Sequence, residues 1–167
     1  MSRPPFSVPQ CTELDDSSKK LAYLVQINLF EELGMDDLKQ IERAMPMLVC
    51  SPGKVLYRPN ETGEVIFFLK EGRVHLYRMG SKERKILIAE VGPGAIFGEM
   101  ALTGHGMYDT YAETIEESLI CVMGRRDAGN FILSRPSVAL RLLRVIFNRI
   151  RNMEDRLEQA SFSTIDR

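Results

Sequence analysis

The sequence predicts a mainly β protein with flanking helices, in which the strands form a β-roll or jelly roll. Between Met47 and Met123, short apolar runs alternate with turn residues, and no helical pattern separates them. Many short strands with regularly spaced turns are typical of a β-sandwich, a jelly roll or a small barrel. A parallel α/β sheet is disfavoured, because helices would then alternate with the strands. Apolar residues at helical spacing appear before and after this region.

The N-terminal part predicts an arm followed by short helices. Residues 1–20 contain proline and serine without periodicity, which is typical of a loose arm. Apolar residues from Leu21 to Phe30 predict a short helix or turn packed on the main body. Leu38, Ile41 and Met45 then lie at helical spacing, and Pro46 ends that helix. The predicted main domain spans residues 21–134.

The central strands are predicted from seven apolar runs. In chain order these runs are MLVC, KVLY, EVIFFL, RVHLYRM, KILIAEV, TYAETI and SLICVM. Turns rich in glycine, proline and asparagine lie between them, at residues 51–53, 59–63, 71–72, 80–81 and 92–94.

The C-terminal part predicts a short helix over 127–133 and a long helix over 135–162, with Pro136 in its first turn. Apolar residues of the long helix recur at alternating spacings of four and three, which is the pattern of a coiled-coil seam. This pattern predicts a parallel homodimer. The alternative is that the helix lies along its own domain. The predicted dimerisation residues are Leu143, Ile146, Ile150, Met153 and Leu157.

Composition excludes several classes of function. A net charge of −1 over 167 residues argues against a broad nucleic-acid footprint. The three cysteines lie far apart without CxxC spacing, which predicts free thiols, no metal site and a cytoplasmic location. No run is long and apolar enough for a membrane span. No nucleophile–base set appears, so the sequence predicts a protein that is not an enzyme.

The segment Phe97–Leu102 carries the strongest functional signal. A glycine at a strand-to-helix turn lets the backbone approach a ligand, and the amides after it can bind an anion. Glu99 at this position can accept a hydrogen bond from a sugar hydroxyl. The alternative is a helical turn that plugs the end of the roll, with Met100 and Leu102 simply buried.

The whole chain, from about Leu21 to Phe162, resembles the cyclic-nucleotide-binding domain of bacterial regulators of the cyclic-AMP receptor protein/FNR type. The resemblance rests on Gly53, Gly72, the segment 92–102 and Ala112-Glu113-Thr114. It implies that Gly98, Met100 and Ala101 offer backbone amides to a phosphate and that Glu99 binds a ribose hydroxyl. It also places Arg149 beside the base, and Met153-Glu154 where cyclic-AMP binders present hydroxyl residues.

One feature of this family is missing. Cyclic-AMP binders carry a phosphate-neutralising arginine after the segment, but no Arg or Lys lies between Ala95 and Glu117. A charge-assisted hydrogen bond to phosphate contributes about 1.5–3 kcal/mol, so this omission argues against cyclic AMP as the ligand. His105, Tyr108 and Tyr111 are candidates for an altered ligand preference. Tyr108 and Tyr111 have the alternative of packing on the roll.

We therefore expect an effector-sensing and dimerisation domain that binds a small anionic or nucleotide-like effector and signals through the long helix. DNA would be contacted only through a helix-turn-helix domain absent from this chain, with residues 163–167 as the hinge toward it. One alternative is a stand-alone module that acts by protein–protein contacts without a small molecule. A haem or redox sensor using His75, His105 or a cysteine is a third.

Overall fold

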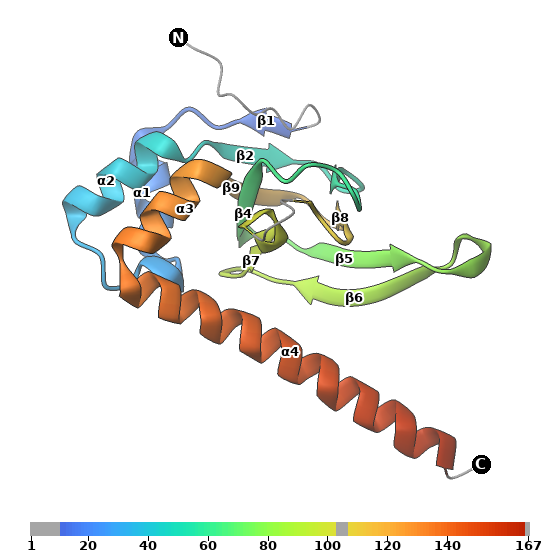
Figure 1. Cartoon of the computed structure of the whole chain (residues 1–167). Coiled ribbons are helices and arrows are strands. Elements are labelled where there is room, and N and C mark those ends of the chain that lie inside the picture. Colours follow the sequence, from blue (N-terminus) through green and yellow to red (C-terminus); the bar gives the residue numbers. More distant parts are fainter. Residues whose placement is uncertain (1–10, 103–106, 166–167) are drawn as a thin grey trace.

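A computed structural model describes residues 11–102 and 107–165 and confirms the predicted mainly β fold (Figure 1). Two antiparallel sheets form the roll, with short helices at one end and a long helix beneath it. The elements in chain order are β1 (Cys11–Glu13), α1 (Ser17–Val25), η1 (Asn28–Phe30), α2 (Met35–Ala44), β2 (Met47–Cys50), β3 (Val55–Tyr57), β4 (Val65–Glu71), β5 (Val74–Met79), η2 (Ser81–Glu83), β6 (Lys85–Val91), β7 (Ile96–Phe97), η3 (Glu99–Leu102), β8 (Tyr111–Thr114), β9 (Ser118–Gly124), α3 (Arg125–Ser134) and α4 (Pro136–Ile165).

The two sheets enclose the core of the roll. One sheet has the strand order β1-β2-β9-β4-β7, and the other has the order β3-β8-β5-β6. β4 and β9 are the central strands of the first sheet, and five consecutive residues of β4, from Val65 to Leu69, are buried. Such continuous burial is expected where one face meets the opposite sheet and the other lies under helices.

The short helices α1, α2 and α3 gather at one end of the roll (Figure 1). α1 begins after Asp16, whose side chain accepts a hydrogen bond from the Lys19 amide at 3.1 Å and so caps the helix. Phe30 of η1 packs against Phe68 of β4 and Phe131 of α3, with ring centroids 5.4 and 5.8 Å apart. These contacts join the helical end to the roll.

α4 starts at Pro136 and runs away from the helical end, beneath β6 (Figure 1). Pro136 fits the first turn because its missing N–H would have no helical partner there. The helix continues to Ile165, so Ser163–Ile165 are helical where a hinge was expected.

The prediction of three free thiols is wrong. Cys11 and Cys50 form a disulfide, and only Cys121 is a free, buried cysteine. The reason is β1, which lies within the segment expected to be an arm and pairs in register with β2, so that Cys11 lies opposite Cys50. Three residues are too few to produce an apolar pattern that would reveal this strand.

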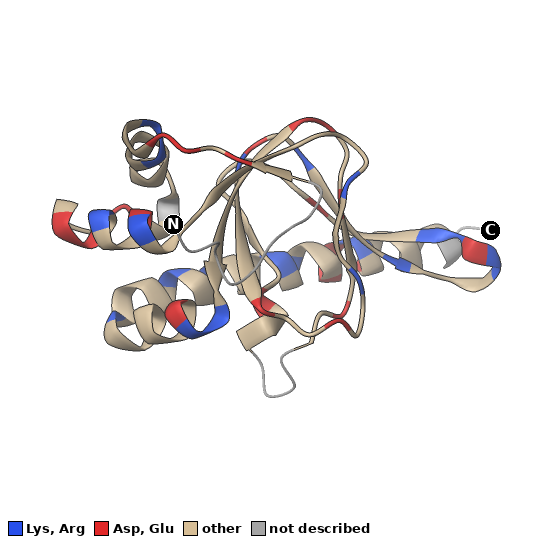
Figure 2. Ribbon diagram, turned by 90° about the horizontal axis from the view of Figure 1, so that it is seen from above, with Lys and Arg blue, Asp and Glu red and all other residues tan. Residues whose placement is uncertain are grey.

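Charges of both signs are interspersed over the described surface, as Figure 2 shows for the helices and the β5–β6 hairpin. This distribution agrees with the near-neutral net charge. None of the described helices is long and apolar enough to cross a membrane.

Candidate functional site

The segment after β7 forms a tight turn into η3. Gly98 has a φ of +75°, in the left-handed region that favours glycine. A Cβ at Gly98 would lie 2.9 Å from the ring of Phe67 and 3.3 Å from that of Tyr108. Ala101 is fully buried, and its amide donates to the Gly98 carbonyl at 3.1 Å. At least one of the amides assigned to a phosphate is therefore already used within the turn.

Glu99 and Arg149, both predicted from the sequence, meet in the structure. The Arg149 guanidinium on α4 donates to the Glu99 carboxylate and to the Ile96 carbonyl. The two side chains are only 17% and 19% exposed, so the ion pair is shielded from solvent. Arg149 thereby joins the long helix directly to the turn between the sheets.

The interior beside this turn is filled with aromatic rings. Tyr57 stacks on Tyr108 with centroids 3.9 Å apart, and Phe67 stacks on Phe97 at 5.0 Å. The Tyr108 hydroxyl donates to the Val65 carbonyl at 2.7 Å. Burial raises the pKa of Tyr108 to about 12, so the hydroxyl remains protonated. Desolvation also raises the pKa of Tyr57.

The structure therefore places Tyr108 in the core, as the packing alternative expects. Tyr111 likewise stacks on Tyr77, with ring centroids 5.0 Å apart. His105 lies outside the described residues. The side chain of His75 bonds to Glu90 at 3.0 Å on a solvent-accessible part of the β5–β6 surface.

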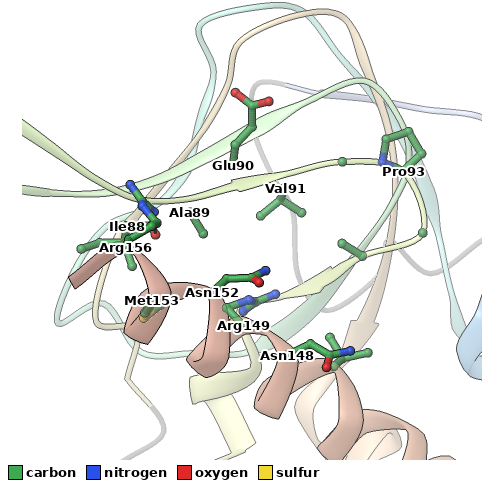
Figure 3. A pocket seen from close by; sticks show the side chains of 14 residues that line it. Ile88, Ala89, Glu90, Val91, Pro93, Asn148, Arg149, Asn152, Met153 and Arg156 are labelled. Carbon is green, nitrogen blue, oxygen red and sulfur yellow. Dashed lines mark hydrogen bonds between the residues drawn. The ribbon is translucent and has the colours of Figure 1, made fainter. Parts of the chain in front are cut away.

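A cleft of about 520 Å³ lies between β6, the Gly92–Ala95 loop and α4 (Figure 3). Ala89 and Val91 point from β6 toward the helix, while Glu90 points away. The helix contributes polar side chains, among them Asn148, Asn152 and Arg149. The full lining is Ile88, Ala89, Glu90, Val91, Gly92, Pro93, Gly94, Ala95, Val145, Asn148, Arg149, Asn152, Met153 and Arg156.

The lining of this cleft carries charges of both signs, the carboxylate of Glu90 and the guanidinium groups of Arg149 and Arg156. The Glu90 carboxylate accepts from His75 and from Arg73, and these hydrogen bonds lower the pKa of Glu90. Arg156 donates to the Ile88 carbonyl at 2.9 Å and to the Leu87 carbonyl at 3.4 Å. Both partners are neutral carbonyls, so these two contacts do not offset the positive charge of Arg156 in the cleft lining.

The structure brings some predicted site residues together and separates others. Met153 lines the cleft beside Arg149, whereas Gly98, Glu99, Met100 and Ala101 lie outside its lining. Sequence reasoning missed Asn148, Asn152 and Arg156. Their spacing of four residues was the available signal, because it puts all three on one face of a helix.

The predicted dimerisation residues differ in exposure. Leu143, Ile150 and Leu157 are 45%, 44% and 68% exposed, although each is a large apolar side chain. Ile146 and Met153 are half-buried. Phe147, also on α4, is 61% exposed. Within residues 11–102 and 107–165, no group of three or more His, Cys, Asp or Glu side chains could hold a metal ion.

Comparisons with known proteins agree with this architecture. A family model described as "Cyclic nucleotide-binding domain" matches residues 48–135. The chain is 30% identical over 112 residues to a cyclic AMP receptor protein of Thermus thermophilus, covering 66% of this chain and 51% of that protein. It is 35% identical over 95 residues to a cyclic nucleotide-gated potassium channel of Rhizobium etli, covering 56% of this chain and 25% of the channel.

A solved structure of a cyclic nucleotide-binding domain from Methylobacillus flagellatus superposes with a TM-score of 0.77. It covers 91% of this chain and 90% of that one at 20% sequence identity, so this likeness concerns the fold. The chain spans only about half the length of the Thermus relative.

Proposed function

Because the chain belongs to the cyclic nucleotide-binding domain family, we propose that it is the effector-sensing and dimerisation domain of a regulator of the cyclic-AMP-receptor type. The effector is a small anionic or nucleotide-like molecule held between the roll and α4. Binding changes the position of α4, and α4 carries the change to whatever follows it in the working protein.

The observation that carries this proposal is the contact of Arg149 with Glu99 and Ile96. A guanidinium has five N–H donors, so a ligand anion can share Arg149 or displace its partners. Either event alters the one described ion pair that links α4 to η3. A ligand shifts such an equilibrium only through its different affinity for the two helix positions.

The cleft supports the nucleotide-like class of effector. Ala89 and Val91 offer an apolar wall on which a flat ring can lie, opposite the carboxamides of Asn148 and Asn152. A carboxamide both donates and accepts, which suits the polar edge of a heterocycle. Arg156 supplies a positive charge at the same site. A volume of about 520 Å³ is in the ordinary range for small-molecule sites.

Thermal unfolding with candidate ligands tests the proposal. We would use millimolar cyclic AMP, cyclic GMP, AMP and a panel of small dicarboxylates. A ligand at about 100 times its Kd stabilises by about 2.7 kcal/mol, which should raise Tm by roughly 5–10 °C. Asn152→Asp should abolish the shift by placing a carboxylate in the cleft, and Arg151→Gln, exposed on the same helix, should preserve it.

A second candidate function is a module that acts by protein–protein contacts without a small molecule. The observation that favours it is the aromatic cluster of Tyr57, Phe67, Phe97 and Tyr108, which occupies the interior beside η3. If no compound in the panel raises Tm and the apolar residues of α4 still mediate association, this second function is supported and effector sensing is wrong.

A further inference from the structure

The two cysteines that were expected to be free join the edge of the five-stranded sheet to its neighbour. Cys11 of β1 lies opposite Cys50 of β2, with Cα atoms 4.5 Å apart. The two ends differ in accessibility, because Cys50 is completely buried and Cys11 is partly exposed. An incoming thiolate therefore meets the sulfur of Cys11 first.

The loop that this disulfide closes contains all the helices that precede the roll. Its cysteines are 39 residues apart, and α1, η1 and α2 lie between them. The same loop contacts the residue just before α4 and the second turn of α4. Asp37 bonds to Arg135 at 2.5 Å, and Glu32 bonds to Arg141 at 2.8 Å.

A surface groove lies at this joint between the helical layer and α4. The groove has a volume of about 360 Å³ and lies between η1, β4 and α4, with Leu29, Phe68 and Val145 in its lining and the charged side chains of Glu31, Arg141 and Arg144 beside them. The contacts between the two layers at this place are therefore partly ion pairs at the surface, which are weaker than close apolar packing.

We propose that Cys11–Cys50 is a thiol–disulfide exchange site, and that its oxidation state sets how firmly the N-terminal helices hold the start of α4. The partner in the exchange is a dithiol reductant. This site is separate from the effector cleft, and its test needs no effector.

The exchange balances as two successive displacements. One thiolate of the reductant attacks the Cys11 sulfur, a mixed disulfide forms, and Cys50 leaves as a thiolate that takes up a proton. The second thiol of the reductant then attacks the reductant sulfur that is bonded to Cys11. Cys11 leaves and takes up the proton that this second thiol loses. Two electrons pass to the protein, both cysteines end as thiols, and the reductant ends as a disulfide.

Reduction should loosen β1, because its pairing with the sheet is short. β1 has three residues and pairs with β2 alone among the described strands. One further backbone bond, from the Leu14 amide to the Met47 carbonyl at 2.7 Å, follows it. A pair this short is marginal without a covalent link, and the 39-residue loop regains its freedom in the unfolded chain.

Cys121 does not compete in this exchange. It lies fully buried on β9, opposite Met47 of β2. Burial raises the pKa of the Cys121 thiol to about 12, so it remains a thiol at neutral pH, and only the thiolate is a nucleophile.

The experiment compares the chain with and without dithiothreitol, using alkylation mass, Tm and hydrogen exchange. The unreduced native chain should take up no iodoacetamide label, and the reduced chain should take up two labels, at Cys11 and Cys50. Reduction should lower Tm by roughly 5–15 °C. It should also speed amide exchange in residues 17–44 and 136–142, while β9 stays protected.

Two variants serve as controls. Cys11→Ser should have the Tm and amide exchange of the reduced chain, and dithiothreitol should change neither. Cys121→Ala should show the full fall in Tm on reduction. If Cys11→Ser fails to fold, the comparison of the oxidised and reduced wild-type chains still tests the proposed exchange site. Label at Cys11 and Cys50 before reduction, or an unchanged Tm, would overturn the site. Unchanged exchange over 136–142 would overturn its coupling to α4.

Discussion

Arg149 is the residue on which the proposed signalling depends, because its guanidinium contacts both the side chain of Glu99 and the backbone of β7. Each partner is mostly shielded from solvent, which makes the pair more consequential than an exposed one. If either charge were removed, the other would be left in a polar but poorly hydrated place.

We expect Glu99→Gln and Arg149→Met each to lower the free energy of unfolding by about 1–3 kcal/mol. The double variant should lose less free energy of unfolding than the sum of the two single losses, since the second change no longer leaves a charge without its partner. Urea unfolding of the four proteins measures this coupling. Strict additivity would show that the two side chains do not interact in solution.

Gly98 has a backbone conformation that other residues resist. Gly98→Ala should destabilise the chain by roughly 2–4 kcal/mol, because φ is +75° and the added Cβ would lie 2.9 Å from Phe67. Chemical denaturation measures the loss. Gly129→Ala is the matched control, since Gly129 lies within α3 with nothing within 4 Å of an added Cβ, and it should be neutral or stabilising.

At the scale of elements, α4 has two faces of different character. One face, with Asn148, Asn152 and Arg156, lines the cleft against β6. Another carries large exposed apolar side chains, including Leu143, Phe147, Ile150 and Leu157. Apolar side chains spaced along a helix in this way favour a second helix as partner.

Ile150→Asp and Leu157→Asp should convert a dimer into a monomer, because each puts a carboxylate in the proposed seam. Sedimentation equilibrium measures the change, expected as a rise of at least tenfold in the dimer dissociation constant. Gln159→Asp, an exposed position on the same helix, is the control and should associate like the wild type. A wild-type chain that is monomeric at high micromolar concentration would contradict the homodimer.

The observed strands show which elements local sequence patterns can predict. The apolar runs predicted β2, β3, β4, β5, β6, β8 and β9, since alternating or continuous apolar segments reflect burial directly. β1 was missed because three residues cannot establish a period, and β7 was expected only as the strand before the turn at Gly98. The helical turn after Gly98 was predicted, and it is η3.

At the scale of the whole molecule, buried thiol and phenol groups make the free energy of unfolding fall at alkaline pH. The raised pKa values of Cys121 and Tyr108, both about 12, belong to the folded state only. A group whose pKa is raised in the folded state contributes its full stabilisation below its unfolded pKa, which is near 9 for the thiol. That stabilisation is lost as the pH rises toward the folded pKa.

We therefore expect stability to fall between pH 9 and 12. At about pH 10.5, Cys121 alone should remove about 2 kcal/mol. Urea midpoints measured from pH 8 upward test this expectation. Cys121→Ala should show a shallower decline, and an identical slope in both proteins would contradict the assignment to this thiol.

Much of this protein follows from the order of its residues. The strands, the helical ends, the turn at Gly98 and the apolar stripe of α4 depend on spacings of a few residues, and such spacings can be recognised in the sequence itself. The tertiary structure decided that Cys11 meets Cys50, that Arg149 meets Glu99, and that Tyr57 stacks on Tyr108. These partners are separated by about 40 to 50 residues, so their contact depends on how the two sheets and α4 pack, and no local pattern encodes that packing.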